Sequence, residues 1–205
     1  HLQEKKHRGV LTGSEITDMR ISVIAGKAHV KHTEGGDFRQ ATYRAVRQGL
    51  RQAETILLEP YYSFRLELPT EQLGRAMTDM ERMSAKLNAP DSSGEYAVLA
   101  GEAPVATIRS YQKDLSAYTG GKGKMSCQLC GYRPCHNTEE VVAQIGYDPD
   151  LDYAATADSV FTAHGSGYIV PWNEVADHVH VDNGYSLEGK QSPEDDYAEP
   201  MTAAM

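Results

Sequence analysis

The hydrophobic period of residues 55–133 changes several times, and the order of these changes constrains the fold more than any other feature. The stretch TILLEPYYSFRLELP predicts a strand interrupted at Pro60. Its apolar side chains share one face, at Tyr62, Phe64, Leu66 and Leu68. Residues 70–85 then change to a helical period. The apolar stripe of this predicted helix comprises Leu73, Ala76, Met77, Met80 and Met83.

The second half of this region again changes from a two-residue strand period to a helical period. Residues 84–104 predict two strands that are joined by a Pro-Asp-Ser-Ser-Gly turn. Residues 104–118 predict a helix with Pro104 at its start, which is a favourable place for proline, and residues 124–132 predict a final strand. The resulting order is β-α-β-β-α-β, which is the arrangement of a ferredoxin-like sandwich in an α+β protein.

Two strands and a helix are predicted ahead of this sandwich. Residues 16–25 follow a rough two-residue period, and Gly26 is placed for a turn into a second strand over residues 27–32. After a double glycine, Asp37 is a natural N-cap residue for a helix over residues 38–53.

The two sides of this predicted helix differ in chemistry. At about 100° per residue, the side expected to face a core carries Phe38, Thr42, Ala45, Val46, Gly49, Leu50 and Ala53. The opposite side carries Gln40, Arg44, Arg47 and Arg51. The sequence therefore predicts a helix with one core face and one basic stripe.

Charge is unevenly distributed along the chain, whose net charge is −9. Residues 1–54 hold ten Lys and Arg against six Asp and Glu, whereas residues 136–205 hold one against fourteen. This asymmetry indicates a polyanion-facing end joined to an acidic, partly disordered extension, in which residues 137–145 predict a short helix. The three cysteines, with no signal-peptide-like or membrane-spanning apolar run, favour the cytoplasm.

Several of these segments together resemble a known family. The run GKAHVKHTEGGDF with its following helix, the run ILLEPYYSFRLELPTEQLGRAMTDM and the run IRSYQKDLSAYTGGKG occur in that order. They resemble the end of domain IV and the start of domain V of elongation factor G. The resemblance is closer to the ribosomal protection proteins that confer tetracycline resistance, and it covers about residues 9–135.

The resemblance implies a division into the C-terminal part of domain IV over residues 1–57, a ferredoxin-like domain V over 58–135 and an acidic extension over 136–205. It implies a translational GTPase whose partner is the ribosome, through ribosomal RNA and ribosomal proteins, with neither DNA nor a membrane as partner. The tip of domain IV, which approaches the decoding centre, would comprise His29, Val30, Lys31, His32 and Thr33.

No GxxxxGK[ST] loop occurs in the sequence, so nucleotide binding by that route is excluded for this chain. GTP and magnesium are therefore expected in another part of the parent protein. For the chain itself, we expect no catalytic residue and no cofactor, with binding and displacement in place of bond chemistry.

The residues themselves give a partial reason for RNA binding. Arg44, Arg47 and Arg51 could engage successive phosphates, whose neutralisation dominates RNA affinity. His29 and His32 could stack on bases or form hydrogen bonds with their edges. The alternative for the arginines is a solvated helix face without a ligand.

Metal binding is the main competing hypothesis. Cys127 and Cys130 have the spacing of a zinc ligand pair, Cys135 and His136 follow, and His164 is a further candidate. Strand alternation would place the first two thiols on opposite faces, which favours reduced structural thiols instead. A zinc-binding RNA-interaction module and a non-ribosomal, ligand-binding ferredoxin-like domain both stay open as alternatives.

A nucleophilic site is the weakest hypothesis. The stretch Ala163-His-Gly-Ser-Gly resembles part of a GxSxG motif, but its first glycine is missing and no strand–turn–helix context surrounds it.

Overall fold

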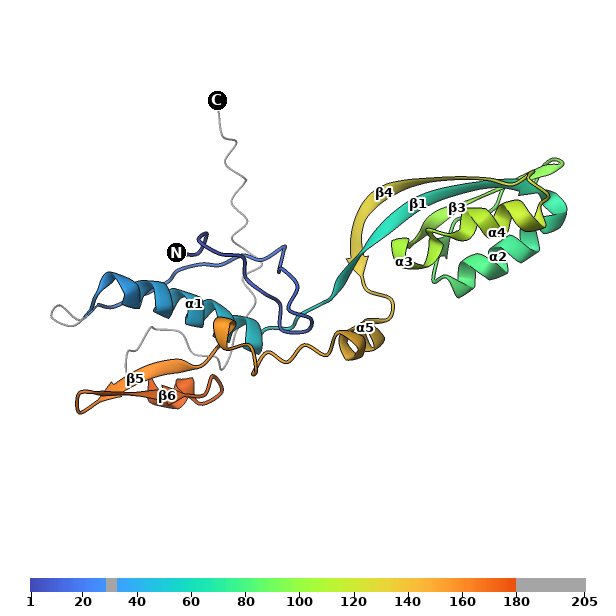
Figure 1. Ribbon diagram of the computed structural model, residues 1–205. Helices are drawn as coiled ribbons and strands as arrows, with labels where there is room; N and C mark the ends of the chain where they lie inside the picture. Colours follow the sequence, from blue (N-terminus) through green and yellow to red (C-terminus); the bar gives the residue numbers. More distant parts are fainter. Residues whose placement is uncertain (29–32, 180–205) are drawn as a thin grey trace, which may run out of the picture. The chain divides into compact units, whose positions relative to one another are not determined.

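The computed structural model describes residues 1–28 and 33–179. Their contacts divide into two compact units (Figure 1). Unit 1 contains residues 1–5, the described residues of 17–48, and residues 157–179, whereas unit 2 contains residues 6–16 and 49–156. No helix of the described residues is long and apolar enough to cross a membrane.

The sheet of unit 2 confirms the predicted ferredoxin-like order. It consists of β1 (Leu58–Pro69), β2 (Lys86–Leu87), β3 (Tyr96–Pro104) and β4 (Lys124–Pro134), arranged as β2-β3-β1-β4. Every pairing is antiparallel. The strand β1 is central because β3 and β4 pair with its two edges.

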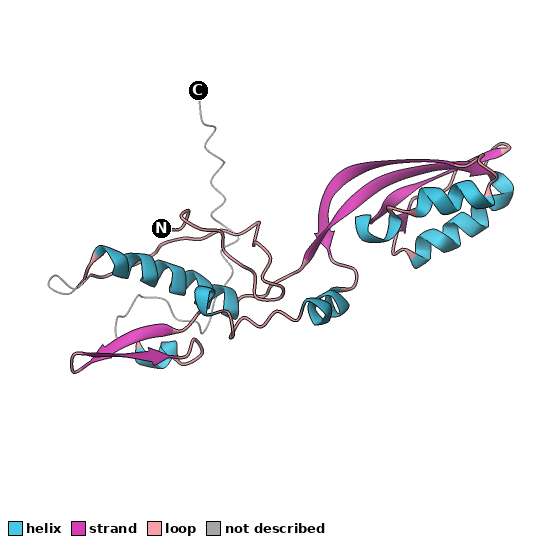
Figure 2. Cartoon of the chain, viewed as in Figure 1, coloured by secondary structure: helices cyan, strands magenta, loops and turns pink. Residues whose placement is uncertain are grey.

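Helices cover one face of this sheet (Figure 2). They are the 3-10 turn η1 (Thr70–Gln72), α2 (Leu73–Arg82), α3 (Val105–Ile108) and α4 (Tyr111–Tyr118). The buried core between the two layers comprises Phe64, Leu66, Leu68, Ala76, Met80, Leu99, Ala103, Ile108, Tyr111 and Leu115. The two-residue and helical periods of the sequence therefore predicted the core-facing sides of β1 and α2 correctly.

Pro60 is accommodated within β1 because of the local pairing. The pairing of β1 with β3 begins at Tyr61, so at Pro60 only β4 lies alongside. A proline without an N–H donor is tolerated at such a position. The register with β4 shifts between Tyr61 and Tyr62, and the additional residue on β4 is Cys130.

The helix predicted over residues 104–118 is divided in two. The first segment, α3, ends at Ile108, and α4 begins at Tyr111. Ser110 precedes α4 with φ −102° and ψ −5°, and its side chain forms no capping hydrogen bond.

Unit 2 also includes part of the acidic extension. The helix α5 (Thr138–Ile145) confirms the predicted short helix, and Gly146 follows it with a φ of 60°, the left-handed conformation common after helices. A 3-10 turn, η2 (Tyr153–Ala155), follows. Nearby, Gly13 also has a positive φ of 69°, and the ring of Tyr147 packs too closely against it to admit a side chain.

Unit 1 is built around α1 (Gly35–Gln52), whose last turn belongs to unit 2. Its other elements come from the end of the described chain, namely the hairpin of β5 (Ser159–Ala163) and β6 (Ser166–Val170) and the short helix α6 (Val175–His178). Residues 180–205, which include the segment predicted to be disordered, lie outside the described residues.

Two expectations for the N-terminal region need correction. Residues 16–28 form no strand, so the strand predicted over 16–25 is wrong. The second predicted strand lies mostly in residues 29–32, outside the described residues. The helix begins at Gly35, ahead of Asp37, whose side chain accepts a hydrogen bond from the backbone N–H of Glu34 at 3.0 Å. Asp37 therefore caps the helix from within its first turn.

Candidate functional site

The predicted RNA-facing tip directly precedes α1. Of its five residues, Thr33 is described and half-buried, while His29, Val30, Lys31 and His32 lie outside the described residues. The helix that follows is exposed at every residue from Gly35 to Ala41, and Phe38 retains 49% of its accessible surface. The tip segment is thus continuous with a solvent-exposed half-helix.

Glu4 contacts α1 near its middle. One carboxylate oxygen, Oε2, accepts a hydrogen bond from the Tyr43 hydroxyl at 2.6 Å and another from Arg39 Nε at 3.0 Å. These donors lower the pKa of Glu4, with the Tyr43 hydroxyl contributing most. The Lys5 ammonium lies 4.1 Å from the centre of the Tyr43 ring, where the face of an aromatic ring attracts a cation.

The predicted basic stripe does not form one solvent-facing surface, which corrects the prediction of helix faces. Arg44 donates a hydrogen bond to the backbone carbonyl of Asp158 at 2.8 Å. Arg47 retains only 4% of its accessible surface. Arg51 forms an ion pair with Asp150 at 2.9 Å, within unit 2. All three arginines therefore lie toward other parts of the chain.

The predicted core face is correspondingly wrong in part. Leu50 is buried, but Phe38, Ala45, Gly49 and Ala53 are exposed. The physical reason is that the acidic segment after residue 136 supplies carboxylates and carbonyl groups to the arginine side of α1. The long apolar stems of arginine can also be buried while their charged ends are paired.

The cysteines do not assemble as the zinc hypothesis required. Cys127 lies exposed in β4, and the partial desolvation of its sulfur by neighbouring atoms raises the pKa of its thiol. The thiol of Cys130 donates to the carbonyl of Tyr61 at 3.3 Å. At about 3.3 Å per residue of strand, Cys127 lies roughly 25 Å from Cys135. The proposed set of Cys127, Cys130, Cys135 and His136 is therefore not one cluster.

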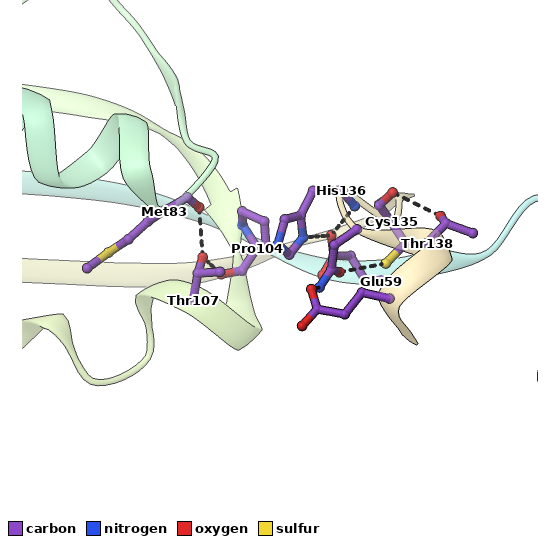
Figure 3. A network of polar contacts seen from close by, with 9 residues as sticks. Glu59, Met83, Pro104, Thr107, Cys135, His136 and Thr138 are labelled. Carbon is purple, nitrogen blue, oxygen red and sulfur yellow. Dashed lines mark hydrogen bonds and ion pairs between the residues drawn. The ribbon is translucent and has the colours of Figure 1, made fainter. Parts of the chain in front are cut away.

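Instead, Glu59 lies beside Cys135 and His136 (Figure 3). The Glu59 carboxylate oxygen Oε1 lies 2.6 Å from Nδ1 of His136 and accepts the backbone N–H of His136 at 2.8 Å. Sequence reasoning missed Glu59, because the predicted order of elements was not carried as far as the pairing of the first strand with the last. That pairing aligns Leu58 with Pro134, so Glu59 lies close to the residues that follow β4.

The region of the weak nucleophile motif has a simple structural role. His164 and Gly165 have φ values of 52° and 82° and form the turn between the antiparallel strands β5 and β6. Two positive φ angles at a two-residue turn suit a tight hairpin. Ser166 begins β6, so no strand–turn–helix elbow presents it as a nucleophile.

Two domain families match the chain in sequence order. Residues 1–54 match elongation factor G, domain IV, and residues 56–141 match the elongation factor G C-terminus. Together these matches extend over more than half of the chain. The second match contains the whole ferredoxin-like sheet of unit 2.

Individual relatives are tetracycline resistance proteins. The chain is 31% identical over 123 residues to TetP of Clostridium perfringens and 34% identical over 124 residues to TetO of Campylobacter jejuni. It is 34% identical over 122 residues to TetM from transposon Tn5251 of Streptococcus pneumoniae. Each match covers 60% of this chain and 19% of the relative, so the matched region spans about a fifth of these relatives' length.

A solved structure from Thermus thermophilus aligns with 47% of this chain and 15% of its own, with 25% identity and a TM-score of 0.43. The family assignment stands on the two domain matches and on the three relatives. These confirm the resemblance stated from the sequence motifs, and the ferredoxin-like topology of unit 2 agrees with it. The chain therefore belongs to the elongation factor G family and carries sequence of its domain IV and of its C-terminal domain.

Proposed function

We propose that this chain is the ribosome-contacting region of a cytoplasmic translational GTPase of the ribosomal protection type. The family assignment supports ribosome binding, and the names of the relatives support the link to tetracycline resistance. The chain acts by binding and by displacing a ligand from the ribosome. GTP and magnesium are held by another part of the parent protein, and hydrolysis there drives release.

One observation carries the assignment of the contact surface. The segment from His29 to Thr33 joins the exposed half of α1, while contacts to Glu4, Asp158 and Asp150 hold the rest of the helix. An anchored helix with an exposed outer half can present a short basic segment to a ligand. Lys31 and the two histidines supply the cations and flat rings that irregular RNA attracts.

The arginines of α1 have a supporting role in this proposal. Arg44 and Arg51 already have partners within the chain, and Arg47 is buried. Binding phosphates through them would first require these contacts to break. They therefore act by holding α1, and the direct RNA contacts belong to the segment before it.

The test compares ribosome affinity of the full-length parent protein and of two variants. Lys31→Ala with His32→Ala changes the tip, and Lys113→Ala with Lys122→Ala is a control that removes exposed lysines from the region of α4. We expect the tip variant to lose about tenfold or more in affinity and to show a shallower dependence on salt, because fewer counterions are released. The control should bind like the unmodified protein.

Two results would overturn the proposal. Equal affinity of the tip variant and the unmodified protein would remove the tip assignment. Equal loss in the tip variant and the control would mean that general charge, and not the tip, determines binding. Release of labelled tetracycline from ribosomes, measured with GTP, separates the protection function from ordinary translocation.

A further inference from the structure

Three possible metal ligands converge where β1 begins and β4 ends. The ligand atoms of Glu59, Cys135 and His136 all lie within 4.8 Å of one another. Among the described residues, this is the one group of three or more potential metal-ligating side chains that lie so close together. We propose that this cluster binds a divalent transition-metal ion, with zinc as the ion that its donor set favours.

The donor set supports this identity. A thiolate, an imidazole nitrogen and a carboxylate oxygen are the three ligand types that zinc uses in proteins. Calcium and magnesium require oxygen ligands and would leave the sulfur and nitrogen unused. Two histidines or a second cysteine are not needed, because sites with three protein ligands and one water are stable zinc arrangements.

The distances are close to those of a tetrahedral site. Zinc bonds of about 2.0 Å to nitrogen or oxygen and about 2.3 Å to sulfur place neighbouring ligand atoms about 3.3–3.6 Å apart. The present separation of Glu59 and His136, 2.6 Å, is a hydrogen bond that the ion would replace. Small side-chain rotations therefore convert the present arrangement into a coordination shell.

The backbone around the cluster is already fixed. The N–H of Cys135 donates to the carbonyl of Leu57 at 2.8 Å. The hydroxyl of Thr138 donates to the carbonyl of Cys135 at 3.1 Å (Figure 3). The side chains of His136 and Glu59 retain 20% and 12% of their accessible surface, although His136 as a whole residue is exposed. The ion would therefore find ligands that are partly sheltered and held in place.

Binding changes the protonation of the cluster in a defined way. The thiol of Cys135 now donates a weak hydrogen bond to Asn137 Oδ1 at 3.4 Å. On coordination its proton passes to solvent, and the thiolate binds the metal. The proton that His136 Nδ1 now donates to Glu59 moves through solvent to Nε2 of the ring. His136 then binds through its unprotonated Nδ1, Glu59 binds as the carboxylate, and water completes the shell.

The test titrates the full chain, first freed of metal with a chelator, with cobalt(II) and then zinc. Cobalt bound to a thiolate gives a sulfur-to-metal charge-transfer absorption. This absorption disappears when zinc displaces the cobalt ion. We expect one equivalent of each metal, and a rise in the unfolding temperature on adding zinc.

Variants separate this site from adventitious binding. Cys135→Ser and Glu59→Gln should each weaken zinc binding by more than about tenfold, because even outer-shell partners contribute that much. Cys127→Ser is the matched control, because it removes an exposed thiol of β4 outside the cluster, and should bind zinc like the unmodified chain. If Cys135→Ser does not fold, the near-isosteric Glu59→Gln decides the matter alone.

Two outcomes would overturn the proposal. One is the lack of a stoichiometric thiolate–cobalt absorption in the unmodified chain. The other is zinc affinity that survives in Glu59→Gln or that falls equally in Cys127→Ser. Neither result would bear on ribosome binding, which the tip variant tests separately.

Discussion

The hydroxyl of Tyr111 donates a hydrogen bond to Oδ2 of Asp79 at 3.1 Å, and it lies 2.9 Å from the hydroxyl of Tyr118. Tyr111 retains 1% of its accessible surface, so this polar group is enclosed between α2 and α4. Burial raises the pKa of Tyr111, and the hydrogen bond with Tyr118 and the charge of Asp79 raise it further. The phenol is therefore held in its neutral form in the folded chain.

We expect unit 2 to lose stability in alkali. The pKa of Tyr111 is raised in the folded state, whereas the unfolded chain ionises it near its ordinary value of about 10. The stabilisation is therefore fully present below about pH 10 and is lost as the pH rises above it. Urea unfolding at about pH 8 and about pH 11 measures this loss.

Tyr111→Phe should reduce the alkaline loss of stability and cost about 1–2 kcal/mol at neutral pH, because Asp79 loses a buried donor. Tyr96→Phe is the matched control, because Tyr96 is 51% exposed and should show the full alkaline loss. An identical pH dependence in Tyr111→Phe and the unmodified chain would contradict the assignment.

Arg44→Ala should loosen α1. The change removes a charged donor from the Asp158 carbonyl and should cost about 1–3 kcal/mol locally. Amide hydrogen exchange of residues 35–48, the part of α1 in unit 1, measures this effect separately from unit 2. Arg65→Ala is the control, because Arg65 is 55% exposed and its pair with Glu67 contributes about 1 kcal/mol at most. Unchanged exchange in Arg44→Ala would show that this contact does not hold the helix.

Leu66→Ala should destabilise unit 2 by about 2–5 kcal/mol, because Leu66 is completely buried in the core under α2 and α4. Leu129→Ala removes the same atoms from a side chain that is 56% exposed and should change stability by about 0.5 kcal/mol or less. Unfolding free energies from urea titration compare the two. Equal losses would contradict the placement of the core on one face of the sheet.

Gly101→Ala should also destabilise the sheet, for a different reason. A Cβ atom at Gly101 would collide with the backbone carbonyl of Lys86, which is fixed in β2. Gly74→Ala, in α2, meets no atom within 4 Å and should leave stability unchanged or raise it by up to about 1 kcal/mol. Thermal unfolding distinguishes the pair, and a stable Gly101→Ala chain would mean that β2 can move aside.

The topology of unit 2 could be predicted because its information is local. Phe64, Leu66 and Leu68 alternate within β1, and their partners on α2 follow a helical period a few residues later. Each helix and strand of unit 2 buries its apolar face against other elements of the same region of the sequence. Only the break near Ser110 and the shortness of β2 were not apparent from the pattern.

The faces of α1 could not be predicted because its partners are distant in sequence and polar. Periodicity assigned Arg44 and Arg47 to solvent, since charged side chains usually lie there. In the structure, Arg44 instead donates a hydrogen bond to the carbonyl of Asp158, which belongs to the acidic segment. The strand predicted over residues 16–25 was wrong for a related reason. Alternation produces a strand only where a partner strand is available, and the described residues provide none for this segment.

The contacts of α1 with later residues also determine when, during synthesis of the chain, this helix can become attached. Arg44 and Asp158 are 114 residues apart, and Gln48 donates to the Trp172 carbonyl at 3.1 Å across 124 residues. Because a chain is synthesised from its N-terminus, the residues of unit 2 are all made before these two partners. The sheet can fold while α1 still lacks these two contacts. A chain interrupted before Asp158 would carry a folded sandwich and an α1 that lacks both of these contacts, so full attachment of α1 requires synthesis to pass Trp172.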